Sequence, residues 1–350
     1  MQNLVIIGNG FDLSHGLKTS YTDFITHLVD NHCENSHMYD DLFTIPNHIN
    51  NFKEFMKYVR DVNVYSDIHS IVKNVFLGTL IEDIALQNWC DIEQKYFSTL
   101  MKISDNYELK RLNSEFSVLK KYLENYLNTE QQSINTIDSY TKYFGSIDSS
   151  ETLILNFNYT KVLKEYFPFY KNAKVVNIHG EINNNDNPII FGYAANDEES
   201  RALIEKNNNN YMRNIKKHNY KRTSNENDLR NYLSNMKYID VTILGHSCGI
   251  SDKHILNQIF NHPKIHSIRL FYYSEYEYYF QTQVNIDRIM ENSANFDKLI
   301  SFSDSYKMPQ KGDDSYLTYK EIVETIQRDQ KATYQKLLNG ENRTKIRRRN

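Results

Sequence analysis

The sequence predicts an α/β fold: a Rossmann-like, mostly parallel sheet with helices on both faces and a helical insertion. Three observations lead to this prediction. Short apolar, β-branched segments recur along the chain, the first of them ends on a glycine turn, and a long stretch with helical periodicity follows it. Strands that are apolar on both faces are typical of a buried parallel sheet.

The first predicted strand spans residues 3–7, NLVII, and ends on Gly8-Asn9-Gly10. A tight turn is expected there because glycine tolerates backbone conformations that other residues avoid. Residues 23–32 then have a helical pattern. The chain is therefore predicted to open as strand, glycine turn and helix.

The next part of the chain is predicted to be helical. Segments 52–62 and 68–89 have helical patterns, and a third apolar series repeats at spacings of three and four, which is one face of an amphipathic helix. That series is Leu109, Leu112, Phe116, Leu119, Leu123 and Leu127.

Strand patterns return in the second half of the chain. The segments are 152–157, 173–178, 239–244 and 267–273. Residues 196–237 are polar and predict a surface helix with a mobile loop. We therefore expect three parts. They are a nucleotide-binding core from 1–45 and 150–308, a helical cap at 46–149, and a helical tail at 309–350 with a basic end.

Composition excludes several classes of protein. The net charge of −3 provides no general attraction to nucleic acid. Three cysteines without metal-ligand spacing predict neither a disulfide framework nor a cysteine metal site, and no metal ligand is expected. No apolar run is long enough to span a membrane, and no signal peptide is recognised, so a soluble, cytoplasmic protein without membrane contact is expected.

The loops after the predicted strands carry small or hydrogen-bonding residues. In an open parallel sheet, ligands bind outside the carboxyl ends of the strands. Four loops are therefore expected to converge on one edge. They contain Gly8-Asn9-Gly10-Phe11-Asp12, Asn158-Tyr159-Thr160, His179-Gly180 and Gly245-His246-Ser247.

The first of these loops is predicted to hold a phosphate group, because glycines allow close approach and the next helix offers free N–H groups. Leu13 stands where a dehydrogenase has its third glycine, and no second strand ending in an acid follows. A hydride-transferring dehydrogenase is therefore disfavoured. The alternative to a phosphate site is that the loop from Gly8 to Asp12 only forms the turn between strand and helix, with glycines that its shape requires.

The sequence Gly245-His246-Ser247-Cys248-Gly249 has the spacing of a hydrolase nucleophile elbow. The last histidine is His266, only nineteen positions after Ser247, so a catalytic triad cannot easily close. We expect Ser247 to bond a phosphate or ribose instead, and Asp252 to help cap the next helix.

The stretch LVIIGNGFDLSHGLKTSYTDF, residues 4–24, resembles the opening of the AbiH family of bacteriophage abortive-infection proteins. The later motifs LNFNYT, NIHG and ILGHSCGISD resemble that family in the same order. The segment NWCDIE, with Trp89, Asp91 and Glu93, is similar to another family element, whose role the sequence does not reveal.

More remotely, the order of loops resembles sirtuin-like NAD-binding domains. Asn158 matches their strand-end asparagine and His179 their H-G histidine, while Gly245, Ser247 and Asp252 fall near their last loop. Thr160 replaces an acid, and the zinc-binding cysteine pairs are missing. The resemblance therefore implies not protein deacylation but cleavage of NAD, as in sirtuin-like bacterial defence proteins.

The implied reaction is hydrolysis of NAD between nicotinamide and ribose, with NAD as substrate and no tightly held cofactor. Asn158 would fix the water or a ribose hydroxyl, and His179, with a near-neutral pKa, would be the base. The loop from Gly8 to Asp12 would hold the diphosphate, and Ser247 would contact the adenosine side. A phage or host trigger and a homo-oligomer are further expectations.

Three other interpretations of the sequence stay open. The protein could be a nucleotide-sensing module that binds without cleavage. It could be a toxin that targets nucleic acid, which would require basic and aromatic residues along a groove. The third is the serine hydrolase with Ser247 as its nucleophile.

Overall fold

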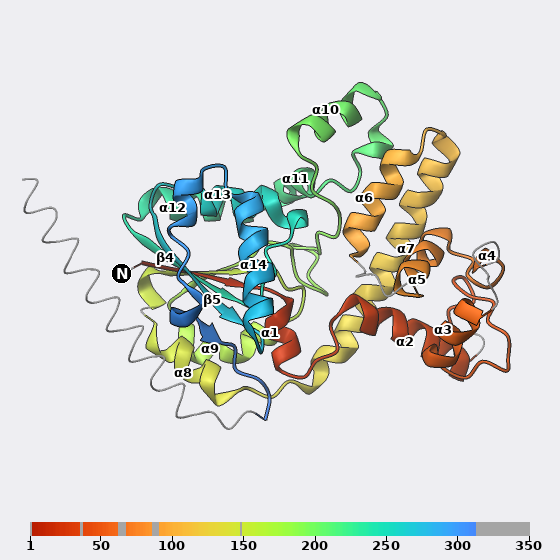
Figure 1. The fold of residues 1–350 in the computed structure, drawn as a ribbon, viewed down its shortest axis with the longest axis horizontal. Coiled ribbons are helices and arrows are strands. Elements are labelled where there is room, and N and C mark those ends of the chain that lie inside the picture. Colours follow the sequence, from red (N-terminus) through yellow and green to blue (C-terminus); the bar gives the residue numbers. More distant parts are fainter. Residues whose placement is uncertain (1, 36–37, 62–67, 86–90, 148, 313–350) are drawn as a thin grey trace, which may run out of the picture.

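The computed structural model describes residues 2–35, 38–61, 68–85, 91–147 and 149–312. A parallel sheet with its covering helices forms one part of the molecule, and a group of helices lies beside it (Figure 1). The group of helices contacts the sheet part near the carboxyl ends of the strands.

The sheet has six strands, all parallel, in the order β3-β2-β1-β4-β5-β6. This is the strand order of the dinucleotide-binding Rossmann fold, in which the order reverses direction beside β1. The strands are β1 (Gln2–Ile7), β2 (Thr152–Asn156), β3 (Lys174–Asn177), β4 (Ile239–Leu244), β5 (Ile265–Tyr272) and β6 (Tyr306–Lys307).

The four inner strand ends are in register. Ile7 pairs with Asn156 on one side and with Leu244 on the other, and Asn156 pairs with Asn177. The loops after β1, β2, β3 and β4 therefore leave the sheet from one edge. This register confirms that the four loops share the carboxyl edge of a parallel sheet.

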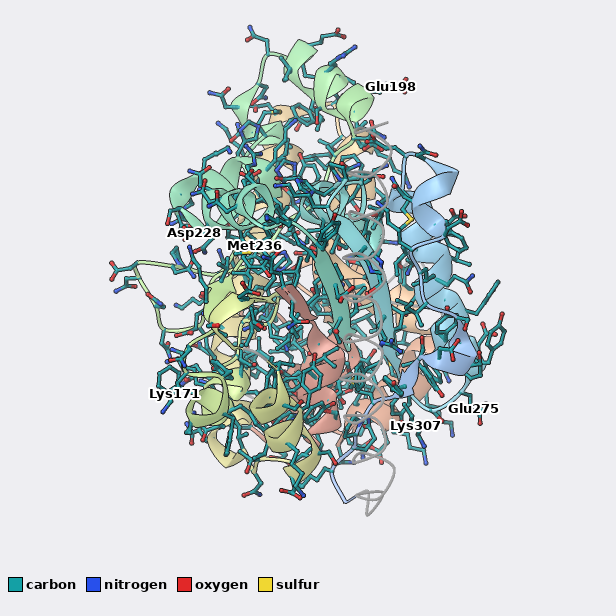
Figure 2. The ribbon with its side chains drawn as sticks, turned by 90° about the vertical axis from the view of Figure 1, so that its left-hand side faces the viewer. Lys171, Glu198, Asp228, Met236, Glu275 and Lys307 are labelled. Carbon is teal, nitrogen blue, oxygen red and sulfur yellow. The ribbon has the colours of Figure 1, made fainter. Side chains whose placement is uncertain are left out.

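Alternation along each strand explains why both faces of the sheet are covered. Leu4 and Ile6 contribute to one apolar cluster, while Val5 and Ile7 contribute to another on the opposite face. In Figure 2, Lys171, just before the edge strand β3, and Lys307, in the edge strand β6, lie on opposite sides of the molecule. The first face is covered by α12 (Asn225–Asn235), α13 (Lys253–Phe260) and α14 (Tyr276–Ile289), the second by α1 (Asn9–Ser14), α8 (Asp138–Ser146), the 3-10 helix η4 (Val162–Tyr166) and α9 (Phe167–Tyr170).

The remaining helices between β1 and β2 form a separate apolar cluster, which we call the helical lobe. Residues 182–215, which follow β3, complete this cluster with side chains such as Phe191 and Tyr193. The ring of Phe191 stacks on that of Phe116 with centroids 4.7 Å apart. The lobe helices are α2 (Tyr21–Glu34), α3 (Phe52–Asp61), α4 (Ile68–Ile71), α5 (Val75–Ala85), α6 (Ile92–Lys102) and α7 (Asn106–Glu130).

The polar segment 196–237 differs from its prediction as a surface helix with a loop. It contains α10 (Asp197–Glu205), α11 (Lys216–Asn219) and α12, and α12 packs on the sheet through its apolar face. Lys216 and Glu226 are each only 1% exposed. Ion pairs with neighbouring side chains allow these charges to be buried.

The predicted fold class is confirmed: the sheet is parallel, helices cover both faces, and a helical part is inserted after β1. The structure adds the short edge strand β6 and the six-residue helix α1, which begins at Asn9 and so includes two residues of the predicted glycine turn. The proposed domain boundaries stay predictions; α2 packs within the helical lobe and α8 packs on the sheet. In the part of the chain that the structure describes, none of the helices combines the length and apolar character needed to cross a membrane.

Candidate functional site

The loops after β1 and β4 are joined by backbone hydrogen bonds. The N–H of Gly8 donates to the carbonyl of Leu244 at 3.0 Å, and the N–H of Gly10 donates to that of Gly245 at 2.8 Å. A Cβ atom on Gly8 would lie 2.5 Å from the Cα of His246. The glycines thus allow the two loops to touch, and these two amides are already engaged by protein rather than free for a diphosphate.

A buried carboxyl group connects α1 with the loop after β2. Asp12 accepts hydrogen bonds from the side-chain amide of Asn158 at 2.7 Å and from the hydroxyl of Thr160 at 2.6 Å. The same amide of Asn158 also donates to the carbonyl of Gly8 at 3.0 Å. Burial raises the pKa of Asp12 to about 7, although both hydrogen bonds oppose this shift.

His179 is 4% exposed and lies after β3. Its Nε2 atom is 3.1 Å from Oδ1 of Asp252 and 3.0 Å from the hydroxyl of Tyr220. Burial and the nearby ammonium of Lys216 lower the pKa of His179 to about 4, against the partial opposition of Asp252. The near-neutral pKa expected from the sequence is thus corrected: the imidazole is neutral well below pH 7.

Asp252 is the centre of a buried charge network. Its Oδ1 also lies 2.9 Å from Nζ of Lys216, and Nζ lies 2.7 Å from Oε2 of Glu93. Lys216, His179 and His246 hold the pKa of Asp252 well below its ordinary value, although burial alone would raise it. Burial raises the pKa of Glu93, and the two carboxylates raise the pKa of Lys216 against the effect of its own burial.

His246 lies between this network and the β1 loop. Its Nε2 is 3.3 Å from Oδ2 of Asp252, and its Nδ1 accepts the backbone N–H of Cys248 at 2.9 Å. The ring of Phe157 contacts both His179 and His246, with centroids 4.9 Å and 4.3 Å apart. Since Nδ1 is an acceptor, His246 is the tautomer that carries its proton on Nε2.

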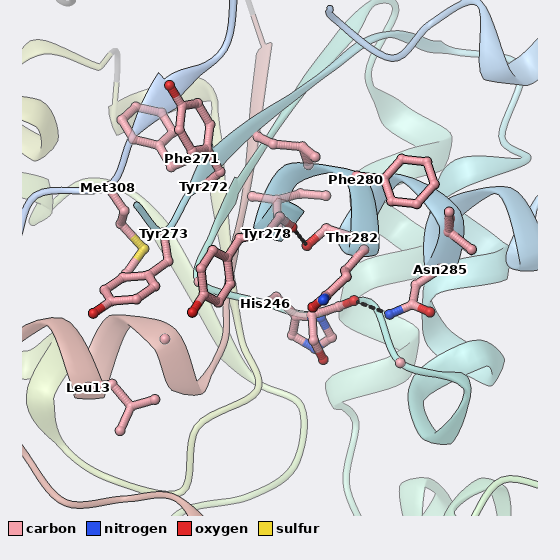
Figure 3. Close-up of a pocket in the computed structure, with 18 of the residues that line it drawn as sticks. Leu13, His246, Phe271, Tyr272, Tyr273, Tyr278, Phe280, Thr282, Asn285 and Met308 are labelled. Carbon is pink, nitrogen blue, oxygen red and sulfur yellow. Dashed lines mark hydrogen bonds between the residues drawn. The ribbon is translucent and has the colours of Figure 1, made fainter. Parts of the chain in front are cut away.

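A cleft of about 1150 Å³ opens on the other side of His246, between α1, the β4 loop and α14 (Figure 3). Tyr273 and Tyr278 line it as exposed rings that contact each other edge to face, with centroids 5.0 Å apart. Leu13 of α1 faces these rings across the cleft in Figure 3. The polar residues that line the cleft include Asp91, Gln94, His246, Ser247, Thr282, Asn285 and Arg288.

The structure divides the residues predicted for the site into two adjoining groups. Gly10, Gly245 and Ser247 line the cleft. Asp12, Asn158, His179 and Asp252 belong to two side-chain clusters behind it: Asn158 bonds Asp12 and the carbonyl of Gly8, and His179 pairs with Asp252. The side chain of Asn9 is hydrogen-bonded to Thr19, and Phe11 packs in the apolar cluster under α8.

The nucleophile-elbow geometry is absent at Ser247. Within the loop 245–249, positive φ occurs at Gly245 (66°) and Cys248 (54°), whereas an elbow places this strain at the serine itself. Asp252 occupies the position before α13, but its side chain makes no capping hydrogen bond. The expectation that it caps this helix is therefore corrected, because its carboxylate turns inward to Lys216 and the two histidines.

Several residues of the site are not found by sequence reasoning. Lys216 and Tyr220 lie in a polar segment with no distinguishing motif, and Glu93 belongs to a motif whose role the sequence does not reveal. Trp89 of the same motif lies outside the described residues. Asp91 lines the cleft, and burial raises its pKa. Among the residues placed by the structure, no group of three or more His, Cys, Asp or Glu side chains could hold a metal ion.

Comparisons with known proteins identify the family. No curated protein gives a significant match to the chain. The family described as bacteriophage abortive infection AbiH matches residues 4–274, which contain most of β1, the strands β2 to β5, the helical lobe and both groups of predicted site residues. The chain therefore belongs to the AbiH family of bacteriophage abortive infection proteins, and its family assigns it a role in anti-phage defence.

Proposed function

We propose that this AbiH protein acts in abortive infection by hydrolysing NAD at the bond between nicotinamide and ribose. One observation carries the proposal. His179 is a buried, neutral imidazole at the carboxyl edge of a Rossmann-ordered sheet, with Nε2 directed to the Asp252 carboxylate at 3.1 Å. No side chain or backbone group of the described residues donates to its other nitrogen, Nδ1, which leaves that lone pair for a proton.

The reaction breaks the C–N bond between the ribose and the positively charged nicotinamide ring. Nicotinamide leaves as a neutral molecule with the bonding electrons, and a water oxygen forms a bond to the ribose carbon. The water's second proton passes to Nδ1 of His179 in this scheme. Asp252 stabilises the imidazolium that results, as the carboxylate partner of a catalytic histidine does.

Asn158 is suited to orient the water or a ribose hydroxyl. Its amide nitrogen is held by Asp12 and by the carbonyl of Gly8, which fixes the direction of its side chain. The Oδ1 atom has no hydrogen-bond donor among the described residues, and the side chain is buried at 7% exposure. A buried acceptor without a donor is costly, and a bound hydroxyl would satisfy it.

The rest of the dinucleotide would occupy the cleft beside His246. A volume of about 1150 Å³ accommodates a ligand of this size. Arg288 lines the cleft and offers a positive charge to the diphosphate, while Ser247 is exposed there with a free choice of hydroxyl direction. Tyr273 and Tyr278 provide ring surfaces on which an adenine base can stack.

Nicotinamide release tests this proposal. The purified full chain is incubated with NAD, with and without lysate of phage-infected cells as a source of the trigger, and free nicotinamide is quantified. His179→Gln and Asn158→Ala should each abolish release in protein that is still folded at the assay temperature. Release that survives both substitutions would remove these residues from the mechanism.

A nucleotide-sensing module is the second candidate, and one observation favours it. His246 is the imidazole that lines the cleft, and both of its ring nitrogens are engaged by Asp252 and Cys248. A dinucleotide confined to the cleft would meet no free base. Calorimetric binding of NAD without any product, in the presence of infected-cell lysate, would favour this function over hydrolysis.

A further inference from the structure

We propose that Lys216 is a positioning residue that holds Asp252, and through it His179, in the reactive arrangement, and that Glu93 makes this arrangement depend on the helical lobe. This inference rests on the proposed function for its catalytic meaning, but its structural content concerns three ionic side chains from separate elements, of which Glu93 and Lys216 are buried and Asp252 is 13% exposed.

Lys216 begins α11 and is 1% exposed. Its ammonium lies 2.9 Å from Oδ1 of Asp252, in the 3-10 helix η7 (Ile250–Asp252), and 2.7 Å from Oε2 of Glu93 in α6. In Figure 1, α11 lies between the sheet part and α6. A buried ammonium with two carboxylate partners is fixed in position, because loss of either contact would leave an uncompensated charge.

Asp252 transmits this constraint to both histidines. Its Oδ1 faces His179 and Lys216 together, and its Oδ2 faces His246. One carboxylate therefore sets the orientation of two imidazole rings. Without the ammonium, the carboxylate would lose its strongest counter-charge, and His179 would become charged beside it more readily.

Glu93 brings the helical lobe into the site. Besides its contact with Lys216, its Oε1 accepts the backbone N–H of Gly192 at 2.9 Å. Both Glu93 and the segment around Gly192 pack with the lobe, whose apolar cluster includes Ile92 and Phe191. A displacement of α6 relative to the sheet would therefore withdraw the second carboxylate from Lys216.

The charge of His179 depends on groups from every element that faces it. They are Asp252 from η7, Lys216 from α11, His246 from the β4 loop, Tyr220 from η6 (Tyr220–Arg222) and Tyr159 from the β2 loop, with Glu93 of α6 behind Lys216. Lys216 is the one cation in this set, so its removal should raise the pKa of His179.

The test compares Lys216→Met with the double variant Glu93→Gln/Lys216→Met in the full chain. The single variant leaves two buried carboxylates without their cation and has a high risk of unfolding. The double variant keeps the net formal charge of the three ionic groups at its original value, and the amide oxygen that Glu93→Gln introduces can still accept the N–H of Gly192. Lys217→Met is the matched control, because the ammonium of Lys217 bonds the hydroxyl of Ser200 and takes no part in the network.

Two readouts separate this inference from the proposed function. The first is NMR titration of the His179 ring, assigned with His179→Gln; the pKa should rise by about one unit or more in the folded variants and stay unchanged in the control. The second is the rate of nicotinamide release, with kcat lowered about a hundredfold, KM nearly unchanged and partial rescue by Lys216→Arg.

An unchanged His179 titration in the folded double variant would overturn the inference. If even the wild-type protein releases no nicotinamide in the presence of infected-cell lysate, hydrolysis fails as the function, but the titration still decides whether Lys216 positions His179. A raised pKa of His179 combined with an unchanged kcat in an active enzyme would also contradict the inference.

Discussion

Nζ of Lys216 lies 2.9 Å from Oδ1 of Asp252, and both side chains are enclosed at the carboxyl edge of the sheet. This pair connects α11 with η7, which follows β4. The same oxygen atom lies 3.1 Å from Nε2 of His179. The polar segment that carries Lys216 is therefore part of the candidate site. The predictions below follow from this arrangement and from the loops around it.

Gly8→Ala should destabilise the fold by about 1–3 kcal/mol, because the new methyl group would lie 2.5 Å from the Cα of His246. The β1 and β4 loops would have to separate. Gly145→Ala in α8 is the matched control, since no atom lies within 4 Å of its Cβ position. It should change the free energy of unfolding by no more than about 1 kcal/mol, and toward greater stability. Denaturant unfolding measures both; equal effects would contradict the account.

Asp12→Asn should change how stability depends on pH. Burial raises the pKa of Asp12 from 3.8 to about 7, so the folded protein holds a proton that the unfolded chain releases near pH 4. The stability that Asp12 contributes is complete below about pH 4 and is lost as the pH rises to 7. Relative to Asp12→Asn, the wild type should therefore lose up to about 4 kcal/mol across this range.

Urea unfolding of both proteins at several pH values between 4.5 and 7.5 measures this difference. Asp138→Asn, at an exposed carboxylate paired with Lys142 on α8, serves as the control. A difference between wild type and Asp12→Asn that stays constant with pH would show that Asp12 is ionised throughout.

Tyr278→Ala should weaken binding of NAD about tenfold or more, because the cleft would lose one of its stacking surfaces. Tyr278→Phe keeps the ring and should bind as the wild type does. Tyr107→Ala is the control, because this ring is 74% exposed on α7 and lies outside the cleft lining. Isothermal titration calorimetry measures the three constants, and equal affinities in all of them would place the ligand elsewhere.

The sheet could be predicted because its signal is local. The apolar run from Leu4 to Ile7 and its glycine turn carry enough information to place a buried strand and the loop after it. The same is true of the loops that hold Asn158 and His179, since strand ends in a parallel sheet must share an edge. The short strand β6, with two residues, has too little pattern to be recognised.

The ionic network could not be predicted, because its partners are distant in sequence. Lys216 lies 123 positions from Glu93 and 36 from Asp252. In a polar segment a lysine is expected at the surface, and only the packed fold shows that two carboxylates allow its burial. The same reason explains Asp252, whose position before α13 suggested a cap although its side chain turns inward.

The direct test of NAD hydrolysis is the NAD content of phage-infected cells that express the chain, because such cells would contain the expected trigger. We expect NAD to fall and free nicotinamide to rise after infection with the wild-type protein, and neither change to occur with His179→Gln at equal expression. If the wild-type protein halts infection while NAD stays constant, the proposed reaction is contradicted.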